Sequence, residues 1–493
     1  MATERGAGMP DADVIIVGAG LSGICAASLL SAKRPADRVI VLEARDAIGG
    51  TWDLFRYPGI RSDSDMHTLG YSFRPWRGQK AITDGGSILS YIRDTAREQD
   101  VERLIRFGHR LLAANWDGVA QHWALRVQTP EGQITLTTRF LLGCTGYYDY
   151  EAGYQPDFAG QEDFAGPLVH PQHWPEGLDW HGKRIAVIGS GATAITLVPE
   201  LARKAAHVSM IQRIPSYVAG MPARDRLGDR VKRILPERAA YAAIRWKNIL
   251  LGMGTYQATQ LWPGFIGRLL ARKAAERSGT DPADFHAPYG PWEQRLCLAP
   301  DGDLFDALRT GRASITTGQI AGFAPDGVRM ESGDLIRADV IVVATGLRMR
   351  LGGGAALSLD GAVLRFADHV SYKGAMLSGV PNFAQMFGYT NASWTLKCEL
   401  IARWVIRLLN RMEAVGATVA TPVSPQDLKL RSAVPLSSGY VQRAHGSLPM
   451  QGDRGPWRVH QNYLRDVYAF RYAPVDDGAM VLSTMDQSFS TRA

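Results

Sequence analysis

The sequence has few cysteines for its length and contains no long apolar run. Only four of its 493 residues are cysteine, and none of them forms a Cys-x-x-Cys pair. This scarcity argues against a disulfide framework, a thiolate metal site and a dithiol reductase, and it favours a reducing cytoplasm as the location. The first dozen residues lack an apolar core and no stretch is long and apolar enough to span a bilayer, so we expect neither a signal peptide nor a transmembrane helix.

The chain also lacks an evenly distributed positive charge. The formal net charge is +7, but the segment 224–277 alone holds twelve lysines and arginines against four acidic residues. The remainder of the chain is therefore close to neutral, which argues against a general nucleic-acid-binding protein. The basic character belongs to one segment.

A glycine-rich turn follows a short apolar strand near the start of the chain. The predicted strand is 13–17, and the next predicted strand, 38–42, ends on Glu43. Between them lie the small residues Gly18, Gly20 and Gly23. Small residues let the backbone approach a pyrophosphate, which rests on the positive end of the following helix. A carboxylate such as Glu43 can bind two ribose hydroxyls but repels a 2′-phosphate.

A second turn of the same kind occurs in the middle of the chain. The predicted strand is 184–188, and the following strand, 207–212, ends on Arg213. The turn contains the small residues Gly189, Gly191, Ala192, Thr193 and Ala194. Arg213 attracts a 2′-phosphate and so favours NADP over NAD. Two dinucleotide sites whose strands end in opposite charges predict a flavoprotein that draws electrons from NADPH.

The pattern around each turn repeats, which predicts an α/β fold. A helix is expected at 88–99, and the strand-like runs are 104–109, 122–128, 133–142, 314–320, 327–330 and 339–343. We read two nested dinucleotide-binding (Rossmann-like) domains with β-meanders, plus a helical insertion in the second. The predicted division is 1–148 and 336–493 for the first domain, 149–220 and 286–335 for the second, and 221–285 for the insertion.

The basic insertion allows two interpretations. Apolar residues follow helical spacing in two stripes, Ala239, Ala243, Trp246 and Leu250 in the first and Trp262, Phe265, Ile266, Leu269 and Leu270 in the second. The simpler interpretation is a helical insertion packed on the second domain. The alternative is a peripheral membrane contact through 224–277. Farther on, the segment 421–456 is rich in Pro, Ser and Gly and predicts a long surface loop.

One motif between the two turns is specific to a known family. The residues Phe164, Gly166, His170, Trp174 and Pro175 match the pattern FxGxxxHxxxWP. That pattern resembles the fingerprint of the type I Baeyer–Villiger monooxygenases. The segments 49–65, 291–298, 388–396 and 456–458 are similar to the subgroup that contains the ethionamide-activating monooxygenase of mycobacteria. The resemblance covers nearly the whole chain.

The resemblance implies an NADPH- and O2-dependent FAD monooxygenase. Such enzymes insert one oxygen atom into ketones, giving esters or lactones, and oxidise sulfides to sulfoxides through a C4a-peroxyflavin. Anionic intermediates need a fixed cation that does not give up a proton, and arginine suits this role. Arg295 matches the active-site arginine of the family, and Asp63 is expected to pair with it.

The resemblance also assigns residues to each cofactor. For FAD they are Gly18, Gly20, Gly23, Glu43, Gly50, Thr51, Trp52, Asp63 and Asn391, with the helix that begins near Ser393. For NADPH and NADP+ they are Arg61, Gly189, Gly191, Ala192, Thr193, Arg213 and Gln294. Many relatives have a lysine where this chain has Gln294, so the preference for NADPH should be weaker here and depend mainly on Arg213. His170 is expected to serve the linker between domains rather than acid–base chemistry.

Two other functions remain open at this stage. One is a flavin monooxygenase that oxygenates sulfur or nitrogen but has no activity toward ketones. The other is a non-catalytic flavoprotein at a membrane surface, which the basic insertion suggests. The sequence leaves the natural substrate and the oligomeric state undetermined.

Overall fold

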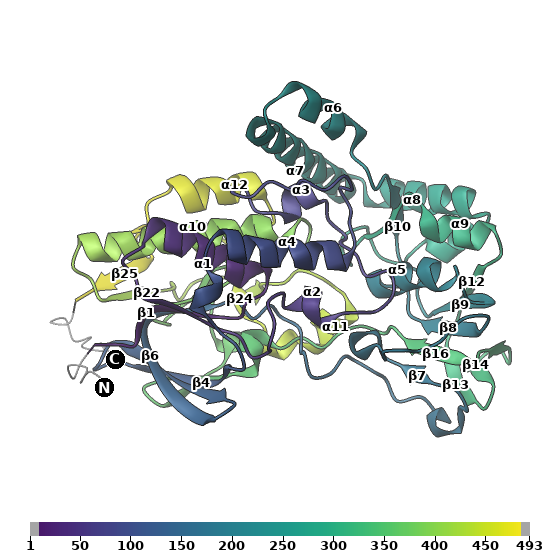
Figure 1. Cartoon of the computed structure of the whole chain (residues 1–493), viewed down its shortest axis with the longest axis horizontal. Coiled ribbons are helices and arrows are strands. Elements are labelled where there is room, and N and C mark those ends of the chain that lie inside the picture. Colours follow the sequence, from purple (N-terminus) through teal and green to yellow (C-terminus); the bar gives the residue numbers. More distant parts are fainter. Residues whose placement is uncertain (1–8, 485–493) are drawn as a thin grey trace.

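Two sheets, each with its own helices, form the two halves of the molecule. The computed structural model describes residues 9–484. In Figure 1 the sheet around β1 and β6 lies on the left and the sheet around β8 and β9 lies on the right, with α6 and α7 above the junction. This arrangement is the predicted α/β fold with two dinucleotide-binding units.

The first sheet has nine strands in the order β18-β17-β4-β5-β6-β1-β2-β3, and β21 pairs with β6. Its strands are β1 (Ala12–Val17), β2 (Val39–Leu42), β3 (Ile105–Arg106), β4 (Arg110–Asp117), β5 (His122–Thr129), β6 (Gly132–Gly143), β17 (Ala356–Leu359), β18 (Ala362–Leu364) and β21 (Phe383–Gln385). Parallel pairing joins β1 to β2 and to β6, whereas β4, β5 and β6 form an antiparallel meander. The apolar strand β1 is central, and its fully buried side chains explain its position.

Helices cover one face of this sheet. They are α1 (Leu21–Lys33), α4 (Gly85–Glu98) and α10 (Trp394–Ala414), which lie together above the sheet in Figure 1. Smaller elements complete the unit: α2 (Thr51–Leu54), α3 (Met66–Leu69), α12 (Tyr463–Val467), β19 (Ser371–Tyr372), β20 (Met376–Leu377), β22 (Val419–Pro422) and β25 (Met480–Ser483). The predicted helix at 88–99 is α4, which begins three residues earlier, after the N-cap Asp84.

The second sheet has five parallel strands in the order β12-β9-β8-β16-β7. They are β7 (Leu168–Val169), β8 (Arg184–Ile188), β9 (His207–Gln212), β12 (Ala313–Thr317) and β16 (Val340–Val343). Beside it lie α5 (Ala192–Leu201), α9 (Asp303–Arg309), the pair β10 (Val218–Met221) and β11 (Cys297–Pro300), and the meander β13 (Ile320–Ala324), β14 (Gly327–Met330) and β15 (Leu335–Arg337).

Three details of the predicted organisation are wrong. The return to the first domain at 336 is too early, because β16 pairs with β7 and β8 in the second sheet. The strand expected at 314–320 is two strands, β12 and β13, in different sheets. The stretch 104–109 contributes only the short β3, and the longer β4 that follows it was not predicted.

The segment 421–456 is not the long surface loop that its composition predicts. It contains β23 (Arg431–Ser432), α11 (Gly439–Arg443) and β24 (Met450–Gln451). The buried side chains of Val434, Val441, Ala444 and Leu448 form a small core with Phe387. Apolar burial therefore fixes this segment against the first unit even though it has no regular periodicity.

The insertion is helical, as predicted, but it contacts both units. It consists of α6 (Arg226–Ile234), α7 (Glu237–Leu261) and α8 (Pro263–Ser278). Whereas α8 packs against α9 of the second unit, α7 packs against α3 of the first. Within residues 9–484 no helix combines the length and the hydrophobicity that crossing a membrane requires.

The first predicted apolar stripe of the insertion points outward. In α7 the buried apolar residues are Ala240, Tyr241, Ile244 and Ile249, whereas Ala239, Ala243, Trp246 and Leu250 of the stripe are exposed. In the second stripe Trp262 and Phe265 are each 60% exposed, and Ile266, Leu269 and Leu270 are partly buried. The apolar spacing thus identified two helices correctly but assigned the wrong face of α7 to the core.

Two chain segments run side by side between the units. One leads from β6 to β7 and the other from β16 to β17. They pair in antiparallel fashion, with hydrogen bonds from the Asp149 amide to the Arg348 carbonyl (2.9 Å) and from the Arg350 amide to the Tyr147 carbonyl (2.9 Å). We call these segments, 145–154 and 345–350, the crossing pair.

Candidate functional site

The first glycine-rich turn is enclosed and its helix lacks a side-chain cap. Gly20 is the N-cap of α1, and among residues 9–484 no side chain caps the free amides of the first turn. A Cβ at Gly23 would lie 1.8 Å from the Gly18 carbonyl oxygen, so only glycine fits there. Gly50, at positive φ, brings a second turn against the first, because its Cβ would lie 3.1 Å from Gly20 Cα. These features fit a pyrophosphate seated on bare amides.

Glu43 lies at the end of β2, beside this turn, and is only 5% exposed. Its Oε2 accepts from the Ala19 amide (2.7 Å) and its Oε1 from the Arg45 amide (3.0 Å). Burial raises the pKa of Glu43, while the two amide hydrogen bonds counteract that effect. Each oxygen keeps a second lone pair, which is what two ribose hydroxyls would need.

The second turn is more open. Gly191 is the N-cap of α5, again without a side-chain cap, and both Gly191 and Ala192 are exposed. Arg213 follows β9 and is also exposed. Within residues 9–484 its guanidinium has no hydrogen-bond or ion-pair partner, so it is free to bind an anion. These features fit a dinucleotide that carries a 2′-phosphate.

Arg295 and Asp63 form the ion pair that the sequence resemblance predicts. Arg295 Nε lies 2.6 Å from Asp63 Oδ2, and Nη2 lies 3.0 Å from Oδ1, so the contact is bidentate. The Arg295 side chain is 30% exposed. Partial burial works against its charge, but Asp63 and nearby tyrosines more than offset this and raise the pKa of Arg295 above the ordinary value. Arg295 is therefore a permanent cation.

Three tyrosines around this pair were missed by the sequence analysis. Tyr147, Tyr148 and Tyr440 are close enough to affect the pKa of Arg295. The hydroxyls of Tyr147 and Tyr148 are 2.9 Å apart, and burial raises the pKa of both tyrosines. They therefore stay protonated and can donate hydrogen bonds. The double tyrosine directly after the predicted strand end at Gly146 was the available signal for two of them.

The residues expected beside the flavin come from two separated segments. Thr51 begins α2, and its hydroxyl lies 3.3 Å from the Tyr150 hydroxyl, while Trp52 is partly buried against the main core. Asn391 donates to the Gln461 carbonyl (3.0 Å), and its own Oδ1 is buried without a partner among residues 9–484. An unpaired buried acceptor fits a cofactor that donates to it.

The remaining residues assigned to NADP differ in their surroundings. Arg61 forms an ion pair with Asp303, with Nη2 3.3 Å from Oδ1. The positive charge of Arg61 is therefore balanced within the protein. Thr193 is close enough to Tyr57 to influence the Tyr57 hydroxyl, although burial is the larger effect and raises that pKa to about 12. Gln294 is half-buried and precedes Arg295 directly.

The segment that carries the fingerprint contacts the crossing pair through two residues that are not fingerprint positions. Gln172 Nε2 donates to the Asp149 carbonyl (2.8 Å), and His173 Nε2 lies 3.0 Å from the Glu151 carbonyl. His170 Nδ1 accepts from the Gln172 amide (3.2 Å), and burial lowers the pKa of His170. The role of His170 in the linker stays a prediction.

The aromatic and small fingerprint residues make packing contacts. Phe164 packs in the core beneath the second meander, against Phe323, and Trp174 contacts Trp180. A Cβ at Gly166 would meet the Asp339 carbonyl, and Pro175 is followed by a turn in which the Leu178 amide donates to the Pro175 carbonyl. The motif thus fixes how the second unit joins the linker.

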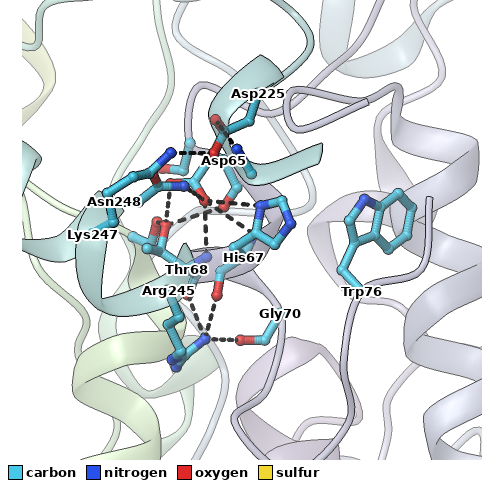
Figure 2. Close-up of polar contacts among 12 residues, drawn as sticks. Asp65, His67, Thr68, Gly70, Trp76, Asp225, Arg245, Lys247 and Asn248 are labelled. Atoms are coloured by element: carbon cyan, nitrogen blue, oxygen red, sulfur yellow. Dashed lines mark hydrogen bonds and ion pairs between the residues drawn. The ribbon is translucent and has the colours of Figure 1, made fainter. Parts of the chain in front are cut away.

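A polar network ties the insertion to the loop that carries Asp63. Figure 2 shows Arg245 of α7 pointing at backbone oxygens of the α3 region, and it donates to the carbonyls of His67 (2.7 Å) and Gly70 (2.6 Å). Asn248 Nδ2 donates to Asp65 Oδ1 (2.8 Å), and Asp65 is the N-cap of α3. Because Asp65 lies two residues after Asp63, α7 helps to position the ion pair.

Comparisons with known proteins agree with this geometry. Residues 16–77 match the NAD(P)-binding Rossmann-like domain, and residues 77–236 match the flavin-binding monooxygenase-like family. The FAD-containing monooxygenase EthA of Mycobacterium tuberculosis is 48% identical over 94% of this chain and 96% of its own length. The probable FAD-binding monooxygenase AlmA of Acinetobacter baylyi is 43% identical over 95% of each chain.

The chain belongs to the FAD-containing monooxygenases. As a member of this family it is an FAD-dependent monooxygenase with an NAD(P)-binding Rossmann-like domain, which confirms the family resemblance seen in the sequence. Solved structures agree on the fold. A steroid monooxygenase with bound NADP superposes with a TM-score of 0.75 at 21% identity, covering 97% of this chain and 100% of that one. Cyclohexanone monooxygenase gives 0.72 at 20% identity over 96% and 99%.

Proposed function

We propose that this FAD-containing monooxygenase converts ketones to esters or lactones and oxidises organic sulfides to sulfoxides. The observation that carries the proposal is the bidentate ion pair of Arg295 and Asp63, held among tyrosines between the two nucleotide turns. Overall, one O2, one NADPH and one proton would give the oxygenated product, NADP+ and one water. Bound reduced FAD would supply the activated oxygen.

Arg295 would stabilise the negative charge that develops on the substrate while oxygen is transferred. Attack on a ketone places an anion on the former carbonyl oxygen, and a fixed guanidinium stabilises that anion without giving up a proton. Asp63 would keep the guanidinium plane in place, because two parallel hydrogen bonds fix its orientation. Tyr147 and Tyr148, kept protonated by burial, would donate hydrogen bonds to the same region.

Glu43 and Arg213 would separate the two cofactors by charge. Glu43 would accept the ribose hydroxyls of FAD, and Arg213 would bind the 2′-phosphate of NADPH. The rest of the assigned FAD and NADP residues would line these two sites. We also propose the domain division given above, with the first domain resuming after β16 rather than at 336.

Product analysis tests the proposal against its nearest alternative, oxygenation of sulfur or nitrogen only. The holoenzyme, NADPH and 18O2 are incubated with phenylacetone or benzyl methyl sulfide, which share a skeleton and differ at the reacting group. We expect benzyl acetate and benzyl methyl sulfoxide, each with one 18O atom. Labelled sulfoxide without any ester supports the alternative, and NADPH consumption without either product contradicts the proposal.

We further propose a peripheral membrane contact at the corner between α7 and α8. The exposed apolar residues there are Leu250, Leu251, Leu261, Trp262 and Phe265. The surrounding segment carries most of the excess positive charge of the chain. Apolar residues that enter the interface, supported by basic residues, favour an anionic lipid surface.

Vesicle co-sedimentation tests this contact. We expect binding to phosphatidylglycerol vesicles, weaker binding to phosphatidylcholine, and loss of binding in Trp262→Ala/Phe265→Ala. Val119→Ala, which trims an even more exposed apolar side chain on the first unit, is the control. Equal binding of the double variant and the control to these vesicles would contradict a membrane contact at this corner. The oxygenation proposal would be unaffected.

A further inference from the structure

A cavity of about 560 Å³ lies in the last part of the chain, outside the proposed oxygenation site. The segment 455–460 forms one wall, and α12 with the turn that follows it forms the other. None of its lining residues is among Arg295, Asp63 and the tyrosines around them. Its volume falls within the range of pockets that hold small organic ligands, about 300–1,000 Å³.

Two arginines at this cavity have no partner. Arg458 and Arg465 line it and are exposed, and neither guanidinium makes a hydrogen bond or an ion pair within residues 9–484. Both lie near His460, another lining residue. Burial lowers the pKa of His460; the Asp466 carboxylate, which also lines the cavity, opposes this, and the positive charges of Arg465 and Arg458 add to it. Both arginines therefore lie in the part of the cavity that contains His460.

The lysines in this region do not add free charge. Lys373 lines the cavity with a side chain that is 5% exposed, and its Nζ lies 3.0 Å from Asp477 Oδ2. Lys373 is thus buried and paired with Asp477, which also lines the cavity. Lys397 lies behind the wall, 2.6 Å from Asp466 Oδ2. Each lysine is neutralised by an aspartate, which leaves the two arginines as a net positive charge.

The rest of the lining is mainly apolar. The side chains are those of Pro456, Leu464, Ala469, Phe470 and Ala473, with Tyr468 at the edge. An inorganic anion would leave this surface bare, and an uncharged apolar ligand would leave both guanidinium groups without a partner. A ligand with an anionic head and an apolar body satisfies both parts.

We propose that this cavity binds an aliphatic carboxylate, with the carboxylate between Arg458 and Arg465 and the chain along Leu464, Ala469 and Phe470. The planar guanidinium matches a carboxylate through two parallel hydrogen bonds. This ligand is distinct from the ketone or sulfide, so the proposal does not depend on the oxygenation chemistry.

Calorimetric titration of the holoenzyme with dodecanoate, below its critical micelle concentration, tests the site. We expect saturable binding that weakens at least about tenfold in Arg458→Ala/Arg465→Ala, since hydrogen bonds between charged groups are the stronger kind. Arg454→Ala is the matched control, because Arg454 lies on the same loop but pairs with Asp427 and does not line the cavity. It should bind dodecanoate like the wild type.

Three comparisons make the result decisive. Dodecanol has the same chain without the charge, and inorganic phosphate has the charge without the chain; both should bind at least about tenfold more weakly than dodecanoate. Arg295→Ala should keep the wild-type affinity for dodecanoate. Affinity that is lost in Arg295→Ala but kept in the double variant would place the ligand at the oxygenation site and overturn the proposal. Absence of saturable binding, or dodecanol binding as tightly, would also overturn it.

Discussion

The two glycine-rich turns have the same plan but differ in enclosure. At the first, α1 is buried through most of its length and Glu43 is almost fully covered. At the second, Gly191, Ala192 and Arg213 are exposed. An enclosed site suits a cofactor that stays bound, and an open one suits a cofactor that must leave after each turnover. Under the proposed assignment of the two turns, solvent access as well as charge would distinguish the FAD site from the NADPH site.

The third small residue of each turn shows that the two turns differ in the space they leave for a side chain, by one methyl group. The first turn has Gly23, where a Cβ would clash with the Gly18 carbonyl, whereas the second has Ala194 in the corresponding position. The first helix therefore sits closer to its strand. Four predictions test this comparison and the site between the turns.

The most general effect, loss of the flavin itself, is expected for Gly23→Ala. The added methyl group would overlap the Gly18 carbonyl oxygen, and overpacking of this kind typically costs about 1–3 kcal/mol or more. We expect FAD content to fall more than about tenfold, as measured by flavin absorbance of the purified protein. The reciprocal change Ala194→Gly should cost only about 1 kcal/mol and leave the flavin in place. Full flavin content in Gly23→Ala would remove the basis of the comparison.

Arg295→Ala tests the residue that lies between the two turns. Removing a preorganised donor to a developing anion lowers rates by about 10²–10³, so ester formation should fall by at least that factor. Flavin reduction by NADPH under anaerobic conditions should persist, because neither turn is altered. Arg224→Ala, which removes an exposed arginine bonded to Gln79, serves as the control. Ester formation at the wild-type rate would refute the role of Arg295.

Arg213→Ala tests the charge at the open turn. Loss of a charge-assisted contact with the 2′-phosphate should reduce the ratio of kcat/KM for NADPH over NADH about 10- to 100-fold, mainly through KM. Arg203→Ala, on the exposed end of the same unit and paired with Glu200, should leave the ratio unchanged. Steady-state kinetics with both nucleotides measure the effect. An unaltered ratio in Arg213→Ala would show that another group selects the cofactor.

The smallest effect is expected for His170→Gln and concerns pH. Burial lowers the pKa of His170 in the folded protein, so the unfolded chain binds more protons as the pH falls below about 6.5. His170 therefore destabilises the fold on acidification, and its replacement should make the free energy of unfolding less sensitive between pH 7.5 and 5.5. Urea denaturation at both pH values measures this. An identical loss in both proteins would contradict neutral burial of His170.

The sequence was sufficient to predict the elements in which small and charged residues follow a recognisable spacing. Both turns, Glu43, Arg213 and the pairing of Arg295 with Asp63 could be inferred because each depends on local spacing or on the family motif. The strand β4 could not, because its leucines and alanines favour helix and only pairing with β5 and β17 makes it a strand.

Long-range contacts were the other obstacle. Tyr440 reaches Arg295 from a segment whose composition predicts a loop, and no periodicity reveals the small core that holds it there. In α7 the buried face includes the charged Arg245, so apolar spacing alone selected the opposite face. A buried arginine that binds backbone carbonyls is visible only once the partner loop is in place.

The crossing pair has a mechanical consequence. A ribbon of two hydrogen-bonded strands bends easily out of its own plane and resists bending within that plane. Because backbone hydrogen bonds join its two segments, a displacement of one segment would carry the other with it. Gln172 and His173 contact the first segment at the Asp149 and Glu151 carbonyls, so the fingerprint loop is tied to the same ribbon.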